Sequence, residues 1–155
     1  MLFILFQLDR DHYALEASRV KVVLPLVRVK RIPGAADGVQ GLFNYRGQPV
    51  PVIDLSRMAL GRPARESLST RLLVVSYRDR TGGTRLLGLV AEYATETLRR
   101  DPEDFVESGL KNDGSPYLGP VARDPRGLIQ WVEVDRLLSA EVHDQLFPPG
   151  TEVVA

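Results

Sequence analysis

The chain has no cysteine and no excess charge of either sign. The absence of cysteine excludes disulfides, thiolate metal sites and cysteine nucleophiles, and it fits a reducing compartment. The 20 basic and 20 acidic side chains cancel, which argues against a general polyanion binder because such proteins usually carry a basic excess. What is left is a neutral globular chain of 155 residues, the length of one domain or of two small lobes that share a core.

Residues suited to catalysis are scarce. The two histidines, His12 and His143, are expected at the surface, and no spacing typical of a zinc site is present. The motifs GxSxG, GxGxxG and the P-loop are absent as well. Asp54 is interpreted as the N-cap of a short helix over 55–60 rather than as a base or metal ligand. The sequence therefore predicts no enzyme, cofactor or metal site, although a hydrolase with two carboxylates paired only in space stays open.

Long apolar runs are missing too. The opening residues MLFILF have no basic segment before them, and Asp9 and Asp11 follow closely, which is not typical of a signal peptide. No run approaches the ~20 apolar residues that span a bilayer. These features predict a soluble, cytoplasmic protein without membrane insertion.

The apolar residues instead form many short runs separated by turns. Hairpins are predicted for 3–6 with 13–15, for 72–77 with 86–91 across Gly82-Gly83, and for 117–122 with 128–132. Strands are also predicted at 27–29, from the alternation of valine with basic residues, and at 93–98. The segment 49–55 is a further predicted strand, which its prolines place at a sheet edge or at a strand start.

Few helices are predicted. Asp101 and Pro102 indicate the start of a short helix, and apolar spacing predicts an amphipathic helix over 134–142. The segment 18–24 fits either a helix or a strand. Many short strands with few helices are typical of an all-β sandwich or barrel. We expect one domain over residues 1–147 and a flexible C-terminal tail over 148–155.

One segment, GLFNYRGQPVPVIDL at 41–55, is unusually specific. Gly41 and Gly47 bracket a turn and permit positive φ or close approach of another chain. Asn44 can hydrogen-bond the local backbone and fix the turn. Arg46 would then present a planar fork to a carboxylate or to the carbonyls at a helix end. An intramolecular salt bridge is the alternative role for Arg46.

This segment resembles the signature of the CheW family, roughly G-x-x-N-L-R-G-x-x-x-P-x-x-D-L, with Tyr45 in place of leucine. The similarity extends over nearly the whole chain. The segment 86–92 is similar to the family's G-[IL]-x-V-D stretch, with Glu92 where aspartate is usual, and 128–138 is similar to its closing strand and helix.

The resemblance implies an all-β fold with minor helices, in which two intertwined five-stranded SH3-like β-barrels share an apolar core. It also implies a non-enzymatic adaptor that couples methyl-accepting chemoreceptors to a CheA-type histidine kinase. The expected partners are the regulatory domain of that kinase and the cytoplasmic tip of the receptor, which would recruit the chain to receptor arrays at the membrane. The departures at Tyr45 and Glu92 favour an accessory pathway, such as surface sensing or pili, over a flagellar one.

Carried over residue by residue, the resemblance implies receptor-binding roles for Val20, Val23, Gly41 and Arg46, and turn or structural roles for Asn44, Gly47 and Asp54. For Val20, Val22 and Val23 a place in the core is an equal alternative. A rival function, a small β-barrel that binds single-stranded nucleic acid, rests on the basic cluster Arg28, Lys30 and Arg31. Aromatic residues for base stacking are not interleaved with that cluster, so a solvated strand face is favoured.

Overall fold

The computed structural model describes residues 1–110 and 113–148. Most of the predicted tail therefore lies outside the described residues, as does Asn112 of the sequence Asn112-Asp113-Gly114, which is typical of a turn. None of the helices in the described part is long and apolar enough to cross a membrane.

Strands dominate the described residues. They are β1 (Leu2–Leu8), β2 (Asp11–Glu16), β3 (Val20–Pro25), β4 (Val39–Tyr45), β5 (Gln48–Asp54), β6 (Arg71–Arg78), β7 (Thr84–Arg99), β8 (Leu118–Asp124) and β9 (Gly127–Val132). The helical elements are short: η1 (Ala17–Arg19), α1 (Leu55–Leu60), η2 (Pro102–Asp104), η3 (Val134–Arg136) and α2 (Ala140–Leu146). The predicted hairpins β1–β2, β6–β7 and β8–β9 and the mostly-β class are confirmed.

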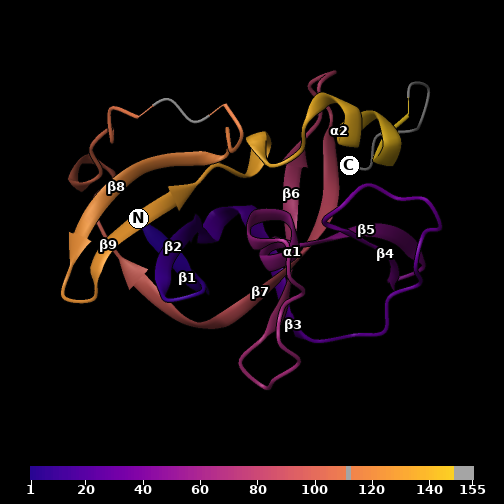
Figure 1. Cartoon of the computed structure of the whole chain (residues 1–155), viewed down its shortest axis with the longest axis horizontal. Helices are drawn as coiled ribbons and strands as arrows, with labels where there is room; N and C mark the ends of the chain where they lie inside the picture. The colour runs from indigo at the N-terminus through magenta and orange to yellow at the C-terminus, as the bar shows by residue number, and fades with distance from the viewer. Residues whose placement is uncertain (111–112, 149–155) are drawn as a thin grey trace.

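The strands form two five-stranded sheets that share β7. Its first half lies between β6 and β5 in the sheet β3-β6-β7-β5-β4, here called the second sheet. Its second half pairs with β1 in the sheet β7-β1-β2-β9-β8, the first sheet. Figure 1 shows β8 and β9 at one end of the molecule, β4 and β5 at the other, and β7 curving between them. Tyr93, with φ of 54°, lies where β7 changes partner.

Isolated bridges bring the outer segments of each sheet together. In the second sheet, Lys30, which follows β3, bridges to Leu42 of β4. In the first, Val106, which follows β7, bridges to Val121 of β8. The two edges of each sheet, β3 and β4 in the second sheet and β7 and β8 in the first, therefore curl toward one another.

Three apolar clusters fill the interior. A central cluster contains residues of both sheets, among them Phe6 and Leu15 from the first and Leu73 and Leu87 from the second. Each sheet also encloses a smaller cluster of its own. Neighbouring residues of one strand thus face different clusters, which explains why β1 and β6 are nearly continuous apolar runs rather than alternating ones.

Several predicted elements differ from the structure. Residues 27–29 do not form a strand, although Val27 and Val29 pack against the second sheet's cluster. The helix predicted over 134–142 is two elements, η3 and α2, and Ser139 caps α2 by accepting from the Val142 N–H at 3.2 Å. The segment 18–24 is partly 3-10 helix and mainly strand. The prolines of β5 lie before Val52, where its pairing with β7 begins, so they occupy the part of the strand with one neighbour.

Candidate functional site

A tight turn joins β4 to β5. Tyr45 and Gln48 are paired, so the loop contains two residues, Arg46 and Gly47. Both have positive φ, 51° and 84°, which is the pattern of a type I′ hairpin turn. The side-chain oxygen of Asn44 accepts a hydrogen bond from the Gly47 N–H at 2.7 Å. Asn44 and Gly47 together hold the tip in a conformation that a residue such as arginine rarely adopts.

Arg46 is exposed at this tip. Its guanidinium carbon lies 5.4 Å from the centre of the Tyr45 ring, a cation–π contact. In the described part of the chain, Arg46 makes no ion pair. The alternative role as an intramolecular salt bridge therefore has no support, and the guanidinium is available to a partner.

Tyr45 connects the tip to the interior. It is half-buried, packs against the second sheet's cluster, and its ring centre lies 6.1 Å from that of Phe43. An aromatic residue here fills the end of the cluster and also supports the Arg46 guanidinium. Leucine, the residue of the family pattern, would do only the first.

Gly41 lies inside the protein. It is buried with φ of 151°, and a Cβ atom at this position would lie 2.0 Å from the carbonyl oxygen of Lys30. The absence of a side chain lets the segment after β3 approach β4, where Lys30 and Leu42 exchange two backbone hydrogen bonds of 2.7 and 2.8 Å. Gly41 therefore contributes to packing and offers no surface for a receptor contact, contrary to its expected role.

The valines of β3 divide between interior and surface. Val20 is half-buried against the central cluster and Val22 against the second sheet's cluster. Val23 is 43% exposed. Because these valines lie in a strand, Val23 is the one that exposes the most apolar surface, while Val20 and Val22 contribute mainly to packing.

Two buried carboxylates fix α1 and the loop that follows it. Asp54 accepts from the Arg57 N–H at 3.2 Å as the N-cap of α1, and from the Ala64 N–H at 2.9 Å. Glu92 accepts from the Ser56 hydroxyl at 3.0 Å and from the Arg65 N–H at 3.2 Å. The geometry gives Glu92 a structural role that the sequence did not indicate.

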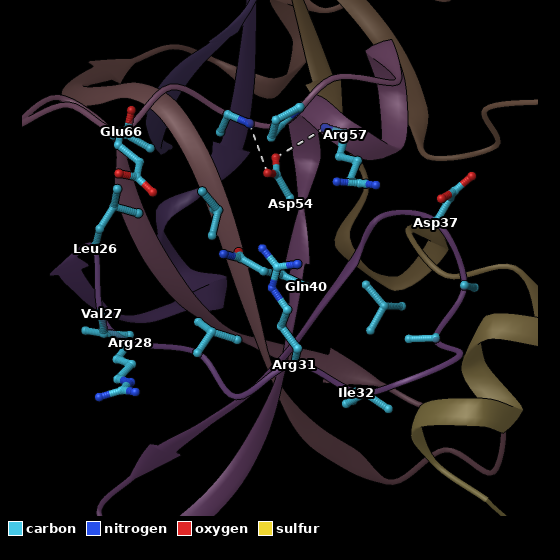
Figure 2. A pocket seen from close by; sticks show the side chains of 18 of the residues that line it. Leu26, Val27, Arg28, Arg31, Ile32, Asp37, Gln40, Asp54, Arg57 and Glu66 are labelled. Atoms are coloured by element: carbon cyan, nitrogen blue, oxygen red, sulfur yellow. Dashed lines mark hydrogen bonds between the residues drawn. The ribbon is translucent and has the colours of Figure 1, made fainter.

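A groove lies beside α1 (Figure 2). It has a volume of about 940 Å³ and is lined by the segment 26–37, the start of β4, and residues around α1 and the loop after it. The sequence marked Arg28 and Arg31 of this lining as part of a solvated strand face and Asp54 as a helix cap, and it did not place them in one site. No signal in the sequence could have joined these two arginines to Arg57 or Arg65, because these residues are brought together only by the fold.

His143 differs from its expected place at the surface. It is 5% exposed, its Nε2 accepts from the Arg80 N–H at 3.2 Å, and its Nδ1 lies 3.0 Å from an Asp144 oxygen. It fastens α2 to the β6–β7 turn. Over residues 1–110 and 113–148, no three or more histidine, aspartate or glutamate side chains gather in a way that could hold a metal ion.

Comparisons with known proteins agree on one family. The model of the CheW-like domain matches residues 2–142. A chemotaxis protein CheW of Helicobacter pylori is 32% identical over 142 residues, 90% of this chain and 82% of the relative. The Bacillus subtilis protein of the same name is 24% identical over 148 residues, 94% and 91% of the two chains. The crystal structure of the scaffolding protein TtCheW from Thermoanaerobacter tengcongensis superposes with a TM-score of 0.77, at 21% identity, and covers 91% of this chain and 89% of that one.

Proposed function

The chain belongs to the CheW-like domain family, and from this premise we propose that it is a non-enzymatic adaptor of a chemotaxis or chemosensory pathway. It couples methyl-accepting chemoreceptors to a CheA-type histidine kinase by binding both. The names of the relatives, chemotaxis proteins and a scaffolding protein, support this role. The rival function, a small β-barrel that binds single-stranded nucleic acid, is not favoured by any of these comparisons.

One observation carries the receptor part of the proposal. Arg46 is exposed at the tip of a type I′ turn, and it makes no ion pair with any described residue. A guanidinium fixed in this way loses little conformational freedom when it binds. A receptor tip built as a helical hairpin offers both carboxylates and helix-end carbonyls, which are the acceptors that an arginine fork fits.

The same proposal specifies which parts of the receptor and the kinase bind the chain. The receptor tip contacts Arg46 and the exposed Val23, and the kinase contributes its regulatory domain. Binding to receptors recruits the chain to arrays at the membrane. The output pathway is an accessory one, such as surface sensing or pili, which the departures at Tyr45 and Glu92 favour.

The test is Arg46→Glu in the full chain. We expect binding to the cytoplasmic fragment of the matching receptor to weaken about tenfold or more, because the reversed charge repels the acceptors. The melting temperature should stay within a few degrees. Binding is measured by isothermal titration, and co-elution with the kinase regulatory domain is measured in parallel.

Arg99→Glu is the matched control. Arg99 is also exposed and makes no ion pair among the described residues, but it ends β7 in the first sheet. This variant should bind the receptor as the wild type does. Equal receptor affinity of the wild type and Arg46→Glu, or unfolding of Arg46→Glu, would remove the proposed role of Arg46.

A further inference from the structure

The groove beside α1 contains arginines that have no internal partner. Elsewhere seven arginines pair with carboxylates: Arg19, Arg62, Arg80, Arg85, Arg100, Arg126 and Arg136. By contrast, the side chains of Arg28, Arg31, Arg57 and Arg65 form neither an ion pair nor a hydrogen bond with the part of the chain that the structure describes, and all four line the groove. Other arginines, such as Arg46 and Arg99, also form no ion pair within the described residues, but the groove gathers four such arginines in one place.

Two of these arginines face a common space. Figure 2 shows Arg31 extending into the middle of the groove beside Gln40, with Arg57 directed to the same region from α1. The carboxylate closest to Arg57 in sequence, Asp54, is buried and accepts two backbone hydrogen bonds: one oxygen accepts from the Arg57 N–H and the other from the Ala64 N–H. It therefore caps the helix, and within the described residues neither guanidinium forms an ion pair with it or with another carboxylate.

The remaining acidic groups lie at the ends of the groove. Asp37 and Glu66 are exposed and appear on opposite sides of the space in Figure 2. Apolar side chains, among them Ile32, Val39 and Val90, line the groove as well. The groove thus combines four arginines with the buried Asp54, the exposed Asp37 and Glu66, and apolar patches, a pattern more selective than a uniformly basic surface.

The long wall of the groove is held in place from behind. Lys30 is bonded to Leu42 through both backbone groups, and the Gly38 carbonyl accepts from the Asp54 N–H at 2.8 Å. The side chain of Gln145 in α2 accepts from the Ala36 N–H at 3.2 Å. Because these bonds fix the wall before any ligand arrives, binding costs less ordering of the loop.

From charge complementarity we propose that the groove is a second docking surface, which takes a segment of a partner protein that places one aspartate or glutamate among apolar residues. The carboxylate binds between Arg31 and Arg57, and its apolar neighbours cover Ile32 and Val39. Asp37 and Glu66 disfavour segments with runs of acidic residues. The site is separate from the hairpin tip, since it includes the start of β4 at Gln40 and Arg46 follows six residues later, ~20 Å along a strand.

The experiment uses the full ¹⁵N-labelled chain and the peptide acetyl-Ala-Leu-Glu-Leu-Ala-amide. Amide shift changes should gather at groove residues such as Gly34 and Arg65. Arg31→Glu should reduce the affinity about tenfold, the loss expected for one charge-assisted pair. Arg31→Gln is the second variant, in case charge reversal impairs folding, and should weaken binding in the same direction. Arg46→Glu should leave peptide binding unchanged, so that the failure of this proposal is distinguishable from the failure of the adaptor proposal.

Three controls decide the outcome. Arg99→Glu changes the net charge equally at a distant position and should bind the peptide as the wild type does. The same peptide with glutamine in place of glutamate should bind at least several-fold more weakly. Equal binding of the two peptides, equal weakening by Arg99→Glu, or groove shifts produced by inorganic phosphate but not by the glutamate peptide would each overturn the proposal.

Discussion

Two hairpins of the second sheet each contain an arginine and a side chain that accepts backbone N–H groups, but one hairpin exposes its arginine and the other buries it. At the β4–β5 tip, Asn44 accepts one backbone N–H, and Arg46 stacks on Tyr45 in the open. At the β6–β7 turn, one oxygen of Asp79 accepts from the N–H groups of Thr81 and Gly83, both at 2.9 Å.

The arginine of the β6–β7 hairpin, Arg85, is buried, whereas Arg46 is exposed. Arg85 pairs with Asp79 at 3.1 Å, and its guanidinium carbon lies 5.3 Å from the centre of the Phe147 ring, next to α2. The side chains of Arg85 and Asp79 are only 8% and 3% exposed. The two hairpins differ in what covers them. The helix α2 packs over the β6–β7 hairpin (Figure 1), and no described element packs over the tip of the β4–β5 hairpin. An arginine is structural or available according to whether another element closes over it.

The largest expected loss of stability comes from breaking the buried ion pair between Arg85 and Asp79. Arg85→Ala leaves the Asp79 carboxylate buried without its counterion, so the free energy of unfolding should fall by about 3 kcal/mol. Urea denaturation followed by circular dichroism measures the change. Arg46→Ala is the matched variant in the open hairpin and should cost less than about 0.5 kcal/mol. Equal losses in the two variants would contradict the contrast between the hairpins.

A smaller effect should appear at low pH. Hydrogen bonding from the Thr81 hydroxyl, from Arg85 and from nearby backbone N–H groups lowers the pKa of Asp79 to about 2, against ~3.9 for an unfolded chain. A carboxyl with a lowered pKa stabilises the fold above pH ~4, and this contribution is lost as the pH falls through ~2.

Urea midpoints measured from pH 5 to pH 2 test this expectation. The wild type should lose about 1–2 kcal/mol more than Asp79→Asn over this range, because the variant has no carboxyl to protonate. The open hairpin carries the uncharged Asn44 at the comparable place and contributes no such dependence. Parallel pH profiles of the wild type and the variant would show that Asp79 is not the responsible group.

The smallest effect concerns the support of Arg46. Tyr45→Leu retains an apolar side chain against the second sheet's cluster but removes the ring beneath the guanidinium, an interaction of about 0.5–1 kcal/mol at an exposed site. We expect a nearly unchanged melting temperature and faster motion of the Arg46 side chain, measured by ¹⁵Nε relaxation. Tyr45→Phe keeps the ring and should behave as the wild type does. Identical relaxation in all three proteins would exclude a role for the ring in positioning Arg46.

The sequence predicted the elements whose signals are local. The hairpin at Gly82-Gly83 and the turn between Gly41 and Gly47 follow from residues that permit positive φ, and Asp54 was identified as a helix cap from its position alone. The strand predicted at 27–29 failed because Val27 and Val29 alternate for packing against the cluster, with the ladder reduced to one bridge at Lys30. Periodicity reports burial, and burial does not require a sheet.

Other features depend on distant contacts and could not be predicted. The helix expected over 134–142 breaks at Ser139, whose backbone is extended and whose side chain caps α2. The apolar residues on both sides of the break, among them Leu138 and Val142, still pack in or against the central cluster, so one apolar pattern serves two elements. His143 is buried by aromatic neighbours from β6 and from its own helix. The groove at Arg31 and Arg57 joins segments about 25 positions apart, and nothing in either segment points to the other.

The shared strand β7 has a consequence for how the chain can be divided. A cut between Ala91 and Glu92 would divide the first sheet, with β1 and β2 in one piece and the second half of β7, β8 and β9 in the other. It would also divide the central cluster, so neither piece would be a self-sufficient folding unit. Expression of either sheet alone should give insoluble or unstructured material, and the intact chain should melt in one transition. We therefore expect the two lobes, which look separable in outline, to unfold together.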